Sequence, residues 1–86
     1  MDRQFTFDYS ALRKDIRAQY GTNDAFAKEI RMGRVSLSQK LNNKLDWTQQ
    51  EMTKSMIALS QPYSAIPAYF FTREVSKTEQ MNRQQG

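Results

Sequence analysis

Apolar residues recur at intervals of three and four along most of this chain, and each run ends after two or three helical turns. Tyr9, Leu12, Ile16 and Tyr20 form the first stripe, which has the period of an amphipathic helix. No pair of segments shows the period of two that marks neighbouring strands. The pattern predicts an all-α, compact domain of four to five short helices.

Polar residues and glycines indicate where the first two helices begin and end. Asp8 or Ser10 is the expected N-cap of the first helix, because short polar side chains accept hydrogen bonds from free backbone amides. Gly21 is expected to end that helix, since glycine reaches left-handed backbone conformations at little cost. Thr22 or Asn23 then caps the second helix.

The third helix is expected to cover residues 34–42. Gly33, or the turn around it, begins this helix, and Leu37 and Leu41 face inward. Asn42 and Asn43 are poor helix formers and are expected to end it.

A capping box predicts the start of the fourth helix. Thr48 and Glu51 have the spacing at which the two side chains satisfy each other's free backbone amides. Pro62 is expected to end the helix, and Pro67 permits at most a short fifth one. The inward-facing residues of the fourth helix are expected to be Met52, Met56 and Leu59.

The last fifteen residues are poor in apolar side chains. Val75 and Met81 are the only ones between positions 72 and 86, which is too few to form a core. We therefore expect one folded domain over residues 1–72 and a tail over residues 73–86. The tail is expected to be mobile or to become ordered on a partner.

The composition argues against an enzyme. The chain has 86 residues, no cysteine and no histidine, which removes disulfides, thiolate zinc sites, the usual general base and the commonest metal ligand. We expect no catalytic residues, no cofactor and no metal. The sequence contains no run of about 18 apolar residues, the length needed to span a bilayer. Residues 1–10 lack the apolar region of a signal peptide. A cytoplasmic protein is expected.

Positive charge is concentrated in one segment. The net charge is +4, and residues 28–44 hold five basic residues against one acid, while eight of each lie elsewhere. Such clustering is typical of a surface that binds phosphates. The alternative is a solvated helix face that happens to be basic.

The second and third helices have the spacing of a helix-turn-helix. Ala27 is the small residue that lets the two helices approach, and Leu37 lies ten positions later, where it closes their packing. Phe26 and Ile30 face the first helix. Residues 23–42 are therefore predicted to form a DNA-binding helix-turn-helix.

The same region resembles a known family. The pattern T-x-x-x-F-A-x-x-I followed by L-S-x-x-L-N is similar to that of the Cro/cI-type phage repressors. More closely, the chain resembles small phage-borne helix-turn-helix proteins of Gram-positive hosts, and the resemblance covers about residues 5–72. The matching pieces are residues 7–10, 21–22, 25–27, 37–38, 41–42, 47, 66–67 and 69–71.

One position departs from that family. Arg31 stands where the turn usually has glycine, and a left-handed arginine would cost on the order of 1 kcal/mol. Placing Gly33 at the turn instead would put Glu29 at the small-residue position, which fits worse. We therefore keep Ala27 at that position and expect a slightly rebuilt turn, with Gly33 as the N-cap of the third helix.

The exposed side of the third helix can read bases. Arg34, Val35, Ser38, Gln39 and Asn42 fall within an arc of about 140°. Arg34 can pair with guanine and Gln39 with adenine, while Val35 offers methyl groups to thymine. Ser38 suits either a base or a phosphate. The resemblance likewise implies that the first turn, Ser38 and Gln39 lie over the bases.

The alternative for Arg34, Ser38 and Gln39 is that each is an ordinary exposed polar residue, but the base-reading role is favoured. A second group of polar residues surrounds these base readers. The resemblance implies that they contact phosphates. They are Thr22, Asn23, Ser36, Lys40, Asn42, Asn43 and Lys44.

Three consecutive aromatic residues follow the proline of the fifth helix. Tyr69, Phe70 and Phe71 could cover the core or form a dimer or protein contact. Core cover is the favoured role for Phe70, and we expect at least one of the three at a dimer contact.

The first functional hypothesis is a sequence-specific transcriptional regulator, a Cro-like phage repressor that binds double-stranded DNA in the major groove. A single short module reads few base pairs, so a homodimer on a pseudo-palindromic operator is expected. The resemblance implies the cytoplasm of a bacterial host.

The alternative is a protein-binding module on a helix-turn-helix scaffold, because a fold does not dictate a function. It would act as an antirepressor or as an inhibitor of a host or defence enzyme. The aromatic residues and the C-terminal region would then contact the protein partner.

Overall fold

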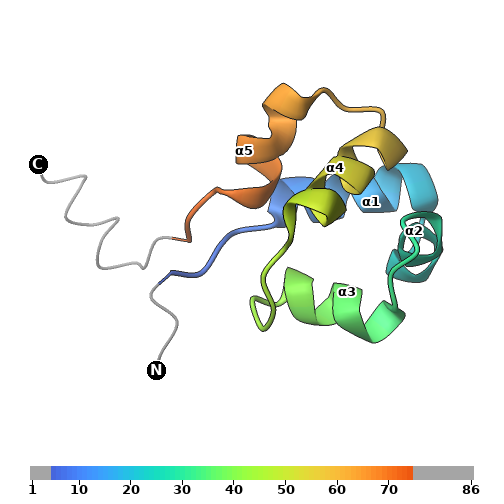
Figure 1. Cartoon of the computed structure of the whole chain (residues 1–86), viewed down its shortest axis with the longest axis horizontal. Coiled ribbons are helices and arrows are strands. Elements are labelled where there is room, and N and C mark those ends of the chain that lie inside the picture. The colour runs from blue at the N-terminus through green and yellow to red at the C-terminus, as the bar shows by residue number, and fades with distance from the viewer. Residues whose placement is uncertain (1–4, 75–86) are drawn as a thin grey trace, which may run out of the picture.

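The computed structural model describes residues 5–74, and Figure 1 shows them as a bundle of short helices. This part of the chain is all-helical, which confirms the predicted fold class. Of the tail predicted for residues 73–86, residues 75–86, with Val75 and Met81, lie outside the described residues. The elements are α1 (Ser10–Tyr20), α2 (Asn23–Glu29), α3 (Arg34–Leu41), α4 (Gln49–Ala58), the 3-10 helix η1 (Tyr63–Ala65) and α5 (Ile66–Phe70).

Three helices start where their caps predict. The Thr22 hydroxyl accepts a hydrogen bond from the Ala25 amide at 3.1 Å and caps α2. Gly33 has an extended backbone and is the N-cap of α3. The predicted capping box opens α4, because the Glu51 carboxylate accepts from the Thr48 amide at 2.9 Å and the Thr48 hydroxyl accepts from the Glu51 amide at 3.1 Å.

The first helix begins differently from the prediction. Its N-cap is Tyr9, which makes no side-chain cap, rather than Asp8 or Ser10. Asp8 still takes part in the helix start, since its carboxylate accepts hydrogen bonds from the hydroxyl and the backbone amide of Ser10. These bonds lower the pKa of Asp8 below its usual value.

Three helices end with a residue other than glycine in the left-handed region. Arg31 after α2, Asn43 after α3 and Ser60 after α4 have φ values of 58°, 64° and 55°. At each end the next amide bonds to a carbonyl five residues earlier, as from Met32 to Ala27 at 2.8 Å. This hydrogen bond belongs to the Schellman motif. The expectation of a rebuilt turn was therefore wrong, because Arg31 itself takes the left-handed conformation that glycine usually has at this position.

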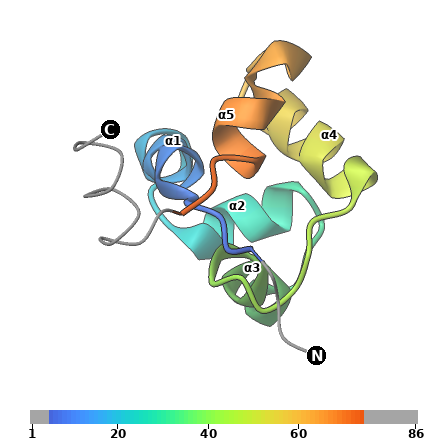
Figure 2. The ribbon, with the colours of Figure 1, turned by 90° about the vertical axis from the view of Figure 1, so that its left-hand side faces the viewer.

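The core lies where α1, α2 and α3 meet under α4 and α5 (Figure 2). Phe26 of α2 is fully buried and packs edge-on against Tyr20 of α1, with ring centroids 5.4 Å apart. Phe70 of α5 packs on Trp47 at 4.8 Å. The fully buried apolar side chains are Leu12, Ile16, Phe26, Leu37, Met56 and Leu59.

Asp15 joins the first helix to the last. Its carboxylate accepts hydrogen bonds from Gln19 at 2.8 Å, from Gln61 at 3.1 Å and from the Tyr69 hydroxyl at 2.8 Å. Burial and the neighbouring Asp15 carboxylate raise the pKa of Tyr69 to about 12. The acid of α1 is thus turned toward α5.

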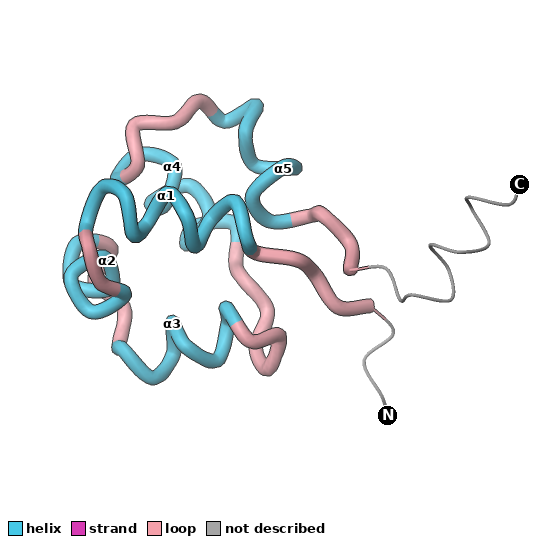
Figure 3. The backbone as a smooth tube through the Cα atoms, turned by 180° about the vertical axis from the view of Figure 1, so that it is seen from behind, coloured by secondary structure: helices cyan, strands magenta, loops and turns pink. Residues whose placement is uncertain are grey.

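The two ends of the described chain run side by side, as Figure 3 shows. The Asp8 amide donates to the Thr72 carbonyl at 2.7 Å, and the Glu74 amide donates to the Thr6 carbonyl at 2.9 Å. Phe7 and Arg73 form an antiparallel bridge. Residues 73 and 74, the first two of the predicted tail, therefore pair with the N-terminal segment.

Candidate nucleic-acid interface

Helices α2 and α3 pack together across a four-residue connection, residues 30–33, and α3 lies along one edge of the molecule (Figure 1). Ala27 is 2% exposed and Leu37 is fully buried, as their places in the motif require. Phe26 and Ile30 are buried as well. One side of α3 therefore enters the core and the other side remains at the surface.

The four predicted base readers all lie on this open side. Val35 is 66% exposed, and Arg34, Ser38 and Gln39 are exposed too. The Arg34 side chain lies 3.9 Å from the Asp24 carboxylate, and both groups are solvated. The structure thus places the four side chains together on one polar helix face that is open to a ligand.

The predicted phosphate-contacting residues fall into two groups. Thr22, Asn23, Asn42 and Lys44 are exposed, and Ser36 is half-buried. Asn42 accepts a hydrogen bond from Arg13 at 3.1 Å. These five residues remain available around α3.

Asn43 is engaged within the fold. Its side-chain oxygen accepts from the Phe7 amide at 2.8 Å, and its side-chain nitrogen donates to the Phe7 carbonyl at 2.9 Å. Asn43 therefore pairs with the N-terminal segment through both polar atoms of its amide, as a neighbouring strand would.

Lys40 also points inward, with only 7% of its surface exposed. Its ammonium group donates to the Asp46 carbonyl at 2.9 Å and lies 3.2 Å from the Glu51 carboxylate. Although partial burial raises the pKa of Glu51, the hydrogen bonds from Thr48 and Lys40 outweigh this effect and lower it. Lys40 connects α3 to the start of α4 and is not placed to reach a phosphate.

The three aromatic residues after Pro67 have different surroundings. Phe70 is buried in the core at 2% exposure, and Tyr69 is half-buried on Asp15. Phe71 is 53% exposed and touches Phe7 edge-on, with ring centroids 6.1 Å apart. Only Phe71 of the three presents most of its surface to solvent.

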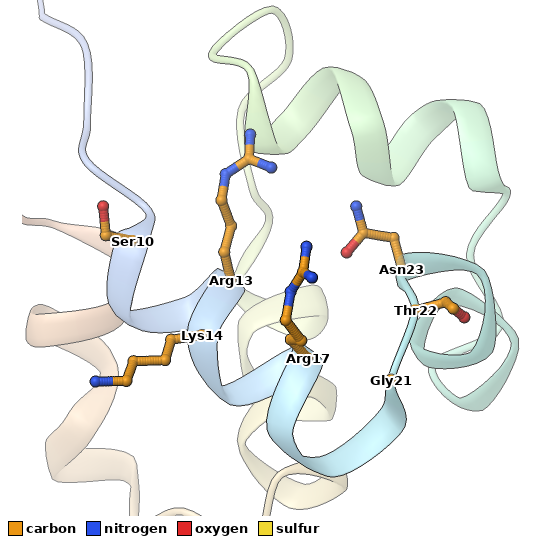
Figure 4. Close-up of a pocket in the computed structure, with 7 residues that line it drawn as sticks. All are labelled: Ser10, Arg13, Lys14, Arg17, Gly21, Thr22 and Asn23. Carbon is orange, nitrogen blue, oxygen red and sulfur yellow. The ribbon is translucent and has the colours of Figure 1, made fainter.

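The structure also groups residues that no motif singled out. Arg13, Lys14 and Arg17 of α1 line a groove of about 730 Å³ beside the start of α2, together with Thr22 and Asn23. Figure 4 shows Arg13, Arg17 and Asn23 pointing toward α3, while Lys14 points away from them. A helical projection of α1 could have found the pair, because positions 13 and 17 are one turn apart.

Two other features are absent from the described region. None of the helices in residues 5–74 is long and apolar enough to cross a bilayer. Within the same residues, no three acidic, cysteine or histidine side chains gather as metal ligands would.

A short helix pair with a buried seam and an open, polar second helix defines a helix-turn-helix protein. The family whose model matches residues 5–73 is described as a protein of unknown function, DUF739. Because the match spans most of the chain, the chain belongs to this family.

A solved structure resembles the same region. It is the solution structure of the modulator of repression (MOR) of the temperate bacteriophage TP901-1 from Lactococcus lactis. The two chains are 34% identical, with a TM-score of 0.69 over 81% of this chain and 95% of that chain. No curated protein matches the chain. The similarity is to a phage regulatory protein, and the finer likeness to Cro/cI-type repressors remains a prediction.

Proposed function

We propose that this protein is a phage transcriptional regulator that binds double-stranded DNA through α3. The observation that supports this proposal is the open face of α3. Arg34, Val35, Ser38 and Gln39 lie there side by side, and their side chains carry groups suited to base edges. The similarity to a modulator of repression from a temperate phage supports a regulatory role. The proposed site of action is the cytoplasm of the bacterial host, and we assign no catalytic role.

In this proposal α3 lies in the major groove and reads a half-site. Eight helical residues contact only a few base pairs, so a homodimer on a pseudo-palindromic operator gives the specificity a regulator needs. The exposed residues Thr22, Asn23, Asn42 and Lys44, with the half-buried Ser36, then contact the flanking phosphates.

The test is a gel shift with the DNA that flanks the protein's own gene, at 50 to 150 mM salt. Arg34→Ala and Gln39→Ala should each weaken binding to the preferred site by about 1–3 kcal/mol, or roughly 5- to 150-fold. Lys54→Ala is the matched control, because Lys54 is an exposed cation on α4. Unchanged binding by both α3 variants would contradict the assigned readers.

A second candidate function is a protein-binding module, either an antirepressor or an inhibitor of a host or defence enzyme. The observation that favours it is a set of exposed apolar side chains, with Ile57 65%, Tyr63 61% and Phe71 53% exposed. No DNA shift at low salt, combined with a stable complex with one phage or host protein, would select this function. Substitution of Ile57 or Phe71 by serine should then break that complex.

A further inference from the structure

The groove between α1 and the start of α2 gathers positive charge. Arg13, Lys14 and Arg17 line it, and none of its lining residues is acidic. The acid of this helix, Asp15, is held by Tyr69 of α5 and by Gln61, which lies between α4 and η1. The three cations are exposed, and Arg13 and Arg17 point to the same side of α1 with no carboxylate in the groove lining (Figure 4). Like charges one helical turn apart repel each other, so the arrangement favours an anionic ligand.

The two arginines have different roles within the fold. Arg13 donates from one guanidinium nitrogen to the Leu41 carbonyl at 3.0 Å and to Asn42 at 3.1 Å, which ties α1 to the end of α3. Its other nitrogens remain available as donors. The Arg17 guanidinium makes no hydrogen bond or ion pair with any residue that the structure describes, and it points into the same space (Figure 4).

This groove borders the face of α3 assigned to DNA. Arg34, Ser38 and Asn42 form one row along α3, because they are spaced by four residues. Arg34 begins the row beside Asp24 of α2, and Asn42 ends it beside Arg13 of α1. When this row of α3 lies in the major groove of a duplex, one sugar–phosphate strand of that duplex runs along the arginines of α1.

We propose that Arg17 and Arg13 form a site for backbone phosphates of the DNA strand that flanks α3. This proposal rests on the proposed function and adds a contact from a helix outside the helix-turn-helix. A guanidinium fits a phosphate because its parallel N–H groups bond two oxygens at once. The contact is independent of sequence and extends the DNA footprint beyond the residues that read bases.

The experiment measures binding of a fluorescein-labelled, 20-base-pair duplex of mixed sequence by anisotropy between 50 and 200 mM NaCl. Arg17→Ala should weaken binding about 5-fold near 150 mM salt and make the log–log salt slope shallower by about 0.9, the value for one lost phosphate contact. Arg17→Lys should restore part of the loss. Lys54→Ala, the matched control on α4, should change binding less than 2-fold, because Lys54 does not line the groove and lies outside α3.

Three other outcomes would overturn the proposal. If Arg17→Ala matches Lys54→Ala while Arg34→Ala still weakens specific binding, the α1 site is wrong and the proposed function stands. If the wild-type protein binds neither this duplex nor the DNA flanking its gene at 50 mM salt, both are wrong. If Arg17→Ala weakens binding to polyglutamate but not to the duplex, the groove serves an acidic protein surface. The Arg17 side chain is exposed and makes no hydrogen bond or ion pair with a described residue, so its variants should melt close to the wild-type temperature.

Discussion

At the scale of single residues, the placement of α3 depends on one buried cation. Lys40 has no more than a tenth of its side chain exposed, and it bonds the Asp46 carbonyl and the Glu51 carboxylate. Glu51 in turn belongs to the capping box of α4. The position of the proposed reading helix is therefore coupled to the first turn of the helix that follows it.

Lys40→Ala should lower the free energy of unfolding by about 1–3 kcal/mol, because it leaves a half-buried carboxylate and a carbonyl without their donor. Urea denaturation at pH 7 measures the change. Lys44→Ala is the control: it removes the same charge from an exposed position and should cost less than about 0.5 kcal/mol. Equal effects of the two substitutions would show that the Lys40 pair contributes no special stability.

The burial of Lys40 could not be predicted from the sequence near it. Lysine is almost never fully buried unless it is paired, and its partner Glu51 lies eleven residues away on another helix. Asn43 is a similar case, since its partner Phe7 is 36 residues distant. Both were expected to contact phosphates from the family resemblance, which concerns the segment around α3 and does not include their partners elsewhere in the fold.

At the scale of helices, local sequence signals predicted most of the starts. Thr22 and Thr48 accept hydrogen bonds from amides within the same turn, and Gly33 begins α3, so their place in the sequence was sufficient. The start of α1 at Tyr9 has no side-chain cap and was not predicted.

The ends were predicted where a local signal marks them. Gly21 after α1 and Asn43 after α3 were expected helix ends, and both helices end there. Ser60 after α4 was not predicted, because Pro62 was expected to end that helix. The arginines of α1 are one helical turn apart in the sequence, but only the packing of α1 beside α3 distinguishes them from ordinary solvated residues.

The left-handed Arg31 provides a direct test of this description of the helix ends. Arg31→Gly should raise the free energy of unfolding by about 0.5–1 kcal/mol relative to Arg31→Ala, because glycine adopts a φ of 58° without the Cβ penalty. The two variants lose the same charge, so chemical denaturation compares the backbone effect alone. A lower stability for the glycine variant would contradict a left-handed residue 31.

At the scale of the whole molecule, the fold redistributes the positive charge. The sequence places the entire excess in residues 28–44, but Lys40 is paired inside and Arg34 faces Asp24. In the sequence of α1, the negative charge of Asp15 partly offsets three positive charges. In the structure Asp15 is turned toward α5, and the three cations line the groove. The basic surface thus extends from α3 onto α1.

The proposed homodimer is also tested at the scale of the whole molecule. Phe71 is exposed beside the paired segments at the two ends of the described chain. If it forms the dimer contact, Phe71→Ser should raise the dimer dissociation constant about tenfold or more, as for a central aromatic contact. Sedimentation equilibrium measures this constant. Tyr63→Ser, at a similarly exposed aromatic residue, is the control, and equal behaviour of the two variants would exclude a special role for Phe71.

The central claim is that the open face of α3 is a DNA interface. Its most direct test is to titrate the protein with a duplex taken from the DNA that flanks its gene and to map the changes in amide chemical shift. We expect the largest changes at residues 34–42, with a second group at residues 13–23, and small changes around Ile57 and Tyr63. Changes confined to residues 57–63 and 71, or no saturable change at 50 mM salt, would contradict it.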